Sequence, residues 1–195
     1  MKKYIGITAI SLLCSAMLLS MPFFDSCANL SRDVMRIHIL AASDSAADQS
    51  LKLCVRDRIV GQCSAYYEDC ASKEEAMEVT RERLGEIEAA AADEIRRRGF
   101  CYPVRAEVGE AYFNTRYYDD FTMPAGWYDS LRVIIGDGEG GNWWCVLYPS
   151  LCVGAAGGRL REQLDSGEYR VVTADRLDCR FKIVEVFEDI AGWFR

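Results

Sequence analysis

The residues best suited to chemistry are concentrated in GDGEGGNWWCVLYPSLC, residues 136–152. This segment joins a glycine-rich loop with two acids to a tandem tryptophan and then to two cysteines seven positions apart. Three kinds of site fit these residue types: a phosphate-binding loop, a cysteine nucleophile, or a rigid aromatic surface held by a disulfide. Each kind places a different demand on the neighbouring residues.

A phosphate-binding loop needs backbone N–H groups away from negative charge, and usually a lysine and a following helix. Here Asp137 and Glu139 would repel the phosphate, no lysine follows, and the next residues have the character of a strand. We therefore do not expect the loop to bind phosphate.

A nucleophilic cysteine needs a histidine, a cation or a helix N-terminus to lower its pKa. Cys145 lies in the middle of an apolar strand, which predicts burial, and His38 is the only histidine in the chain. A catalytic Cys145, or Asp137 and Glu139 acting as an acid–base pair or as calcium ligands, is a weaker alternative that the sequence leaves open.

The third kind of site fits the pattern best. In an exported domain, a bridge between Cys145 and Cys152 would close a loop of eight residues around Pro149, worth about 2.5 kcal/mol in the chain-entropy model. Trp143 and Trp144 point to opposite faces of their strand, so one should enter the core. A large aromatic residue on a rigid edge is typical of interface anchors. Two tryptophans that only pack in the fold explain the pattern equally well.

The N-terminus has the features of an export signal. Two lysines precede an apolar run of 20 residues, 5–24, which suits a signal peptide and is also long enough for a membrane anchor. The small residues 26–28 suit cleavage after Ala28. We expect residues 1–28 to be a signal peptide or N-terminal membrane anchor, and residues 29–195 to form a single extracytoplasmic domain.

Composition narrows the possible partners. The net charge of −7 argues against nucleic acid, because phosphate backbones require a basic surface. The same negative charge disfavours adsorption to anionic lipid. We therefore expect membrane contact only through the N-terminal segment, if that segment is uncleaved. Seven of the nine cysteines follow residue 28, with no C-x-x-C pair among them. With a single histidine, this predicts no metal site and no cofactor.

The remaining pattern predicts an α+β fold. Residues 34–43 alternate as a strand, with His38 facing solvent or a helix. A first helix begins within residues 43–49, where Ser43, Asp44 or Ser45 can cap it, and carries Cys54, Cys63 and Cys70. A second spans 72–98 and is capped by Ser72. Short strands follow from Cys101, and residues 181–194 fit either a strand or a helix. The expected order is an N-terminal strand, two helices, a mostly antiparallel sheet of short strands, and a C-terminal strand or helix.

These residues together resemble a known family. The signal-like N-terminus, RIHILAASDSAADQSLKLCVRDRI, MPAGWYDSLRVIIGDGEGGNWWCVLYPSLC and the FKIVEVFED tail are similar to stage II sporulation protein R of endospore-forming bacteria. The resemblance is strongest over residues 36–60 and 123–152. It is thin over the second helix and over 153–180.

The resemblance implies a signalling protein rather than an enzyme. Such a protein is exported from the forespore into the space between forespore and mother cell. There it triggers a membrane-embedded aspartic protease, which removes the pro-sequence of sigma-E. The partner would therefore be the extracytoplasmic face of that protease. The candidate partner contacts are Trp143 and Trp144, with Asp44, Ser45 and Asp48 as weaker candidates.

Two other functions remain as alternatives. One is a secreted hydrolase of septal cell-wall material that uses Asp137, Glu139 or Cys145 in catalysis. The other is a passive structural component of the septal space.

Overall fold

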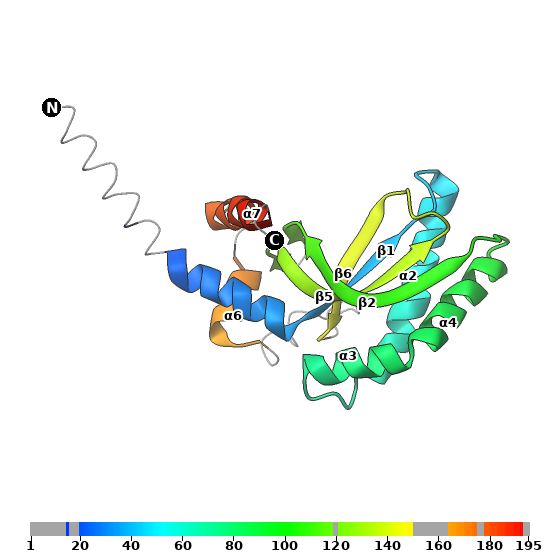
Figure 1. The fold of residues 1–195 in the computed structure, drawn as a ribbon, viewed down its shortest axis with the longest axis horizontal. Helices are drawn as coiled ribbons and strands as arrows, with labels where there is room; N and C mark the ends of the chain where they lie inside the picture. Colours follow the sequence, from blue (N-terminus) through cyan, green and yellow to red (C-terminus); the bar gives the residue numbers. More distant parts are fainter. Residues whose placement is uncertain (1–14, 16–19, 119–120, 150–163, 175–177, 193–195) are drawn as a thin grey trace. The chain divides into compact units, whose positions relative to one another are not determined.

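The computed structural model describes residues 15, 20–118, 121–149, 164–174 and 178–192 (Figure 1). The chain divides into two compact units. Unit 1 consists of Met1–Leu30, Asn114–Gly126 and Leu164–Arg195. Unit 2 consists of Ser31–Phe113 and Trp127–Gln163.

Unit 2 is built on a four-stranded sheet of order β2-β5-β1-β6. Its strands are β1 (Met35–Leu40), β2 (Val104–Phe113), β5 (Gly126–Ile135) and β6 (Asn142–Tyr148). β1 pairs with β5 in parallel and with β6 antiparallel. The predicted α+β fold is confirmed, and the sheet is mixed because it contains the parallel β1–β5 pair. The long helical connection that follows β1 makes the parallel pair possible, because parallel strands need such a crossover.

Three helices follow β1 in unit 2 and pack beside the sheet (Figure 1). They are α2 (Ala46–Tyr66), α3 (Lys73–Glu82) and α4 (Leu84–Arg97). The Ser45 side chain accepts the Asp48 N–H, so Ser45 is the N-cap among the three candidates of the first helix. The Ser72 side chain accepts the Glu75 N–H, which confirms the predicted second cap. The second predicted helix is divided at Arg83, which caps α3 and precedes α4. Since α2 ends at Tyr66, Cys70 lies beyond the helix on which the sequence places it.

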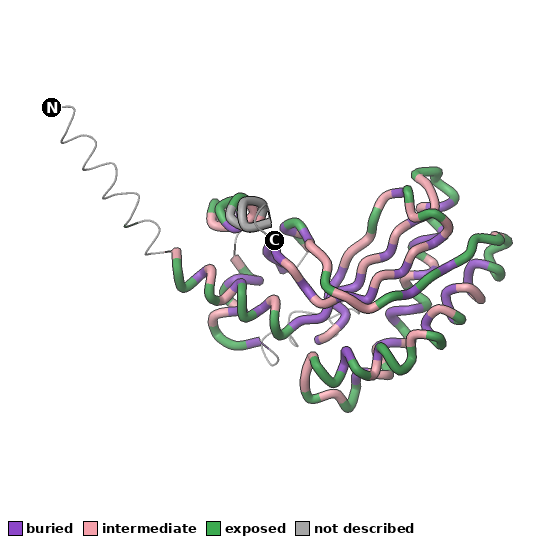
Figure 2. The backbone as a smooth tube through the Cα atoms, viewed as in Figure 1, coloured by how far each residue is buried: buried purple, intermediate pink, exposed green. Residues whose placement is uncertain are grey.

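The core of unit 2 lies between the sheet and the helices (Figure 2). Alternate residues of β1 are fully buried, and so is the apolar stripe of α2, as their periodicities predict. The β1 residues are Met35, Ile37 and Ile39, and the α2 residues are Leu51, Val55, Ile59 and Cys63.

The other side chains of β1 meet aromatic rings. The Arg36 guanidinium, fully buried, lies 4.2 Å from the Phe113 ring centroid and 5.0 Å from that of Tyr128. The His38 ring lies 5.3 Å from that of Trp144. His38 is half-buried among aromatic side chains.

Unit 1 contains a helix over residues 20–33, α6 (Ser166–Val172), α7 (Cys179–Gly192) and a two-stranded sheet. Its strands are β3 (Arg116–Tyr117) and β4 (Thr122–Met123). The C-terminal segment, whose sequence fits either a strand or a helix, lies in the helix α7. Phe181 and Val184 are buried there at helical spacing. Among the residues that the structure describes, no helix combines the length and apolarity needed to cross a membrane.

Candidate partner-binding surface

The glycine-rich loop and the start of α2 form one hydrogen-bonded cluster. The Gly141 N–H donates to Asp44 Oδ1 at 2.6 Å, and the Gly140 N–H donates to the Ala41 carbonyl at 2.9 Å. Lys52 Nζ donates to the Gly141 carbonyl at 2.8 Å. The two sequence segments with the strongest family resemblance thus hold each other in place.

Close packing explains the glycines of this loop. A Cβ at Gly140 would lie 2.2 Å from the Ser43 carbonyl oxygen, a distance that no real side chain tolerates. Gly136 and Gly138 have φ angles of 61° and 70°, which favour glycine. The loop is therefore glycine-rich because it turns sharply against a neighbouring backbone.

Asp48 organises the start of α2 from a buried position, with 5% of the residue exposed. Its Oδ2 accepts the Ser43 hydroxyl at 2.5 Å. Hydrogen bonds, chiefly this one and a further one from Tyr102, hold the pKa of Asp48 below its ordinary value, against the opposing effect of burial. The hydrogen bonds to Asp48, chiefly that from Ser43, thus keep its carboxylate charged.

The weaker candidate contacts differ in exposure. Asp44 and Ser45 are exposed, while Asp48 is buried. The Asp44 carboxylate holds Gly141, and Ser45 caps α2. All three therefore have a local structural role, and Asp44 and Ser45 also present surface to a partner.

The tandem tryptophans point to opposite faces of β6, and both are half-buried. Trp143 lies on the side of α2, where the Arg56 guanidinium is 5.1 Å from its ring centroid. Trp144 stands opposite His38 in the register and lies 6.5 Å from Phe113, ring to ring. Neither side chain is completely buried in the core, so each retains some area for contact.

Trp143 follows the 136–141 loop, which is hydrogen-bonded to the start of α2, and we use the name loop–tryptophan surface for side chains of the loop, α2 and Trp143. It consists of Asp44, Arg56, Asp137, Glu139 and Trp143. Asp44, Asp137 and Glu139 are exposed, and Arg56 also pairs with Asp57 at 2.7 Å. An aromatic side chain with charges around it is a common form of protein-binding surface.

Sequence reasoning missed Lys52 and Arg56, which support this surface. Lys52 is 5% exposed, and burial lowers the pKa of its amine while the nearby Asp44 carboxylate raises it. The sequence did contain one signal for Lys52, which is its spacing from Asp48. Lys52 follows Asp48 by four residues and so falls on the buried side of the helix.

Cys145 is disulfide-bonded and buried, so its thiol is not available as a nucleophile. Its predicted partner, Cys152, lies outside the described residues. The free cysteines among the described residues are Cys27, Cys54, Cys63, Cys70, Cys101 and Cys179.

We predict that Cys145 and Cys152 are bonded to each other in the exported protein. Peptide mass spectrometry without reduction should find one peptide pair joined through these two residues. Finding Cys152 alkylated in protein trapped with iodoacetamide would contradict the pairing.

Replacing Asp48 with asparagine is expected to destabilise unit 2 at pH 7 and to have a smaller effect in acid. Because the folded-state pKa lies below the ordinary 3.8, the carboxylate stabilises the fold above that value. This contribution is lost as the pH falls through the lowered pKa. Urea unfolding midpoints at pH 7 and pH 3 measure the difference. Asp137→Asn, at an exposed position of the same cluster, is the matched control. An Asp48→Asn deficit of equal size at both pH values would contradict the prediction.

Comparisons with known proteins concern mainly unit 2. A family model described as stage II sporulation protein R matches residues 31–157. A protein of Bacillus subtilis (strain 168) named Stage II sporulation protein R is 38% identical over 118 residues, which are 60% of this chain and 53% of the relative. The chain therefore spans about half the length of the curated relative it matches. No solved structure matches the chain.

Proposed function

The chain belongs to the stage II sporulation protein R family, and we propose that it has a role in sporulation. On this premise we propose that it is an exported signalling protein that activates a membrane-embedded aspartic protease. It acts from the space between forespore and mother cell, at the extracytoplasmic face of the protease. The protease then processes pro-sigma-E in the mother cell.

One observation supports the choice of the loop–tryptophan surface as the binding surface. The loop–tryptophan surface is held rigidly by hydrogen bonds between the 136–141 loop and the start of α2. It also lies within residues 31–157, the part of the chain that matches the family. A preformed surface loses little conformational entropy on binding, which favours affinity.

The energy required of this surface is modest. An activator shifts a protease toward its active form only by binding that form more tightly. A hundredfold activation requires about 2.7 kcal/mol of differential binding, and a single anchoring tryptophan contributes about 2 kcal/mol or more. The acids Asp44, Asp137 and Glu139 would favour a partner surface with basic groups and speed the encounter.

The proposal assigns no catalytic step to the chain itself. Two observations support this assignment. Cys145 is disulfide-bonded, and the exposed acids Asp137 and Glu139 lie at a turn that packs against the start of α2. We assign these acids to partner binding.

Reconstitution in a non-sporulating bacterial host tests the function. The host expresses the protease and pro-sigma-E with the exported chain, without it, or with a chain that lacks residues 1–19, keeps the 20–33 helix and is retained in the cytoplasm. We expect pro-sequence loss on a gel only with the exported chain. If exported, folded chain leaves pro-sigma-E intact, the proposal fails. Turnover of purified peptidoglycan that is abolished by Glu139→Gln would then support the septal hydrolase.

A further inference from the structure

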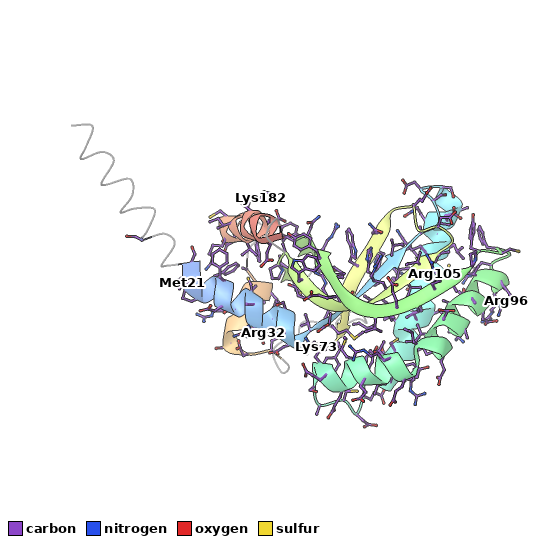
Figure 3. All side chains as sticks on the ribbon, viewed as in Figure 1. Met21, Arg32, Lys73, Arg96, Arg105 and Lys182 are labelled. Atoms are coloured by element: carbon purple, nitrogen blue, oxygen red, sulfur yellow. The ribbon has the colours of Figure 1, made fainter. Side chains whose placement is uncertain are left out.

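The helix over residues 20–33 supplies core side chains to unit 1. Phe23, Cys27 and Leu30 recur at i, i+4 and i+7 on one face, and they are 6%, 6% and 0% exposed. On the same helix Met21, labelled in Figure 3, is 55% exposed. The helix therefore has a buried face and an open face, as expected of an element that packs in a folded unit.

Residues at the start of α7 enclose Phe23. Its ring lies 5.3 Å from that of Phe181, at an interplanar angle of 71°, and Phe181 is 1% exposed. The Arg180 guanidinium lies 4.3 Å from the Phe23 centroid. Arg180 is held there by Asp178, whose Oδ1 accepts its Nε–H at 2.9 Å. Without Phe23, both Phe181 and Arg180 would lose the ring that they pack against.

The same helix also fits closely against the start of α6. A Cβ at Gly167 would lie 2.7 Å from the Ser26 hydroxyl oxygen, so Gly167 allows the close approach of the two helices. The Ser26 hydroxyl donates to the Pro22 carbonyl at 2.9 Å, which fixes the position of its oxygen. The 20–33 helix is therefore fitted to two elements from the C-terminal part of the chain.

This packing bears on where the N-terminus can be processed. The small residues 26–28 permit cleavage after Ala28, but the Ala28–Asn29 bond lies inside the helix. Cleavage there would remove Phe23 and Cys27 from the core and separate them from Leu30. We infer that the folded protein retains the 20–33 helix as a permanent part of unit 1, and that any N-terminal processing falls before Ser20.

This inference does not depend on the proposed function. It concerns residues 20–30, α6 and α7, which lie outside the 31–157 match and include none of the candidate partner contacts. The experiments below use neither protease nor pro-sigma-E, so their failure would leave the proposed function untouched.

The first test is the intact mass of the mature protein. The full chain with a C-terminal tag is expressed in a non-sporulating bacterium and purified through the tag from all cell fractions and the medium. We expect a mass that includes residues 20–33. A protein with the mass of the tagged 29–195 chain would overturn the inference.

The second test uses the native Cys27 thiol to measure the packing of the helix. Burial raises the pKa of this thiol to about 12 and keeps it unreactive. In the full chain, we expect Phe23→Ala to increase the rate of Cys27 alkylation by N-ethylmaleimide at least about tenfold, because the emptied site loosens the helix. Met21→Ala, at the exposed position of the same helix, is the matched control and should react at the wild-type rate.

Equal Cys27 rates in Phe23→Ala, Met21→Ala and the wild type would show that Phe23 does not hold the helix, and would overturn the inference. Hydrogen exchange of α2 amides, in unit 2, shows whether the variant is folded elsewhere. If α2 loses protection in Phe23→Ala, the milder Phe23→Leu replaces it. This variant keeps an apolar side chain but removes the ring contact with Phe181, and the same two outcomes apply.

Discussion

Replacing Trp143 with alanine is expected to reduce pro-sigma-E processing at least about tenfold in the reconstituted host, while the protein stays folded and exported. The side chain is half-buried beside Arg56 on a strand fixed in the sheet. Losing an anchor of this kind costs about 2 kcal/mol of binding. Since activation depends on differential binding, processing falls with it. Gel quantification of processed and unprocessed sigma-E gives the ratio.

Trp127→Ala is the matched control for this loss. Trp127 is also half-buried in unit 2, on β5, where its ring lies 5.7 Å from that of Tyr112 and outside the loop–tryptophan surface. The Trp127→Ala variant should lose a similar amount of side-chain packing and still activate pro-sigma-E processing at the wild-type level. A double variant of Trp143 and Trp144 that folds, is exported and signals at the wild-type level would remove the tryptophans from the binding surface.

The Gly140→Ala substitution is expected to destabilise unit 2 by about 3 kcal/mol. The new Cβ would lie 2.2 Å from the Ser43 carbonyl oxygen and 2.4 Å from its carbonyl carbon. Both contacts are with backbone, so no side chain can rotate away. The 136–141 loop must then separate from the start of α2. A urea unfolding curve should show a lower midpoint.

Gly61→Ala separates this clash from a general effect of the added methyl group. Gly61 is exposed on α2, and a Cβ there meets no atom within 4 Å. This variant should be as stable as the wild type or more stable by about 0.5–1 kcal/mol, since alanine favours a helix. If Gly140→Ala unfolds at the same urea concentration as Gly61→Ala, the close contact does not exist in solution.

The sequence predicted well wherever the cause is local. Ser72 caps its helix as its spacing to Glu75 indicates, and one of the three candidates for the first cap, Ser45, caps α2, because a cap depends on three or four neighbouring residues. The buried side of β1 follows from alternation. Local signals failed at 181–186, where an alternating pattern suits a strand but the chain is helical. There Phe181 and Val184, spaced for a helix, pack into unit 1.

The candidate site depended on contacts that no local pattern contains. Asp44 and Gly141 are 97 positions apart, and their hydrogen bond brings the two motifs together. The sequence analysis took candidate partner contacts from both the start of α2 and the segment 136–152. It did not indicate that the two segments are hydrogen-bonded to each other. The paired strands β1 and β5 are also far apart in the chain, and the register of their parallel pairing is set by the folded sheet. The spacing of Lys52 from Asp48 places it on the buried side of α2, but its acceptor Gly141 follows 89 positions later and is not indicated by any local pattern.

The central claim is that the chain activates a separate protease and does not itself cut the substrate. The most direct measurement adds the purified full chain, in vesicles, to reconstituted protease and pro-sigma-E and follows the cleavage rate. The account predicts that the rate rises with chain concentration and saturates, and that chain and substrate without protease give no product. A protease rate that is independent of the chain, or product formed by the chain alone, would contradict it.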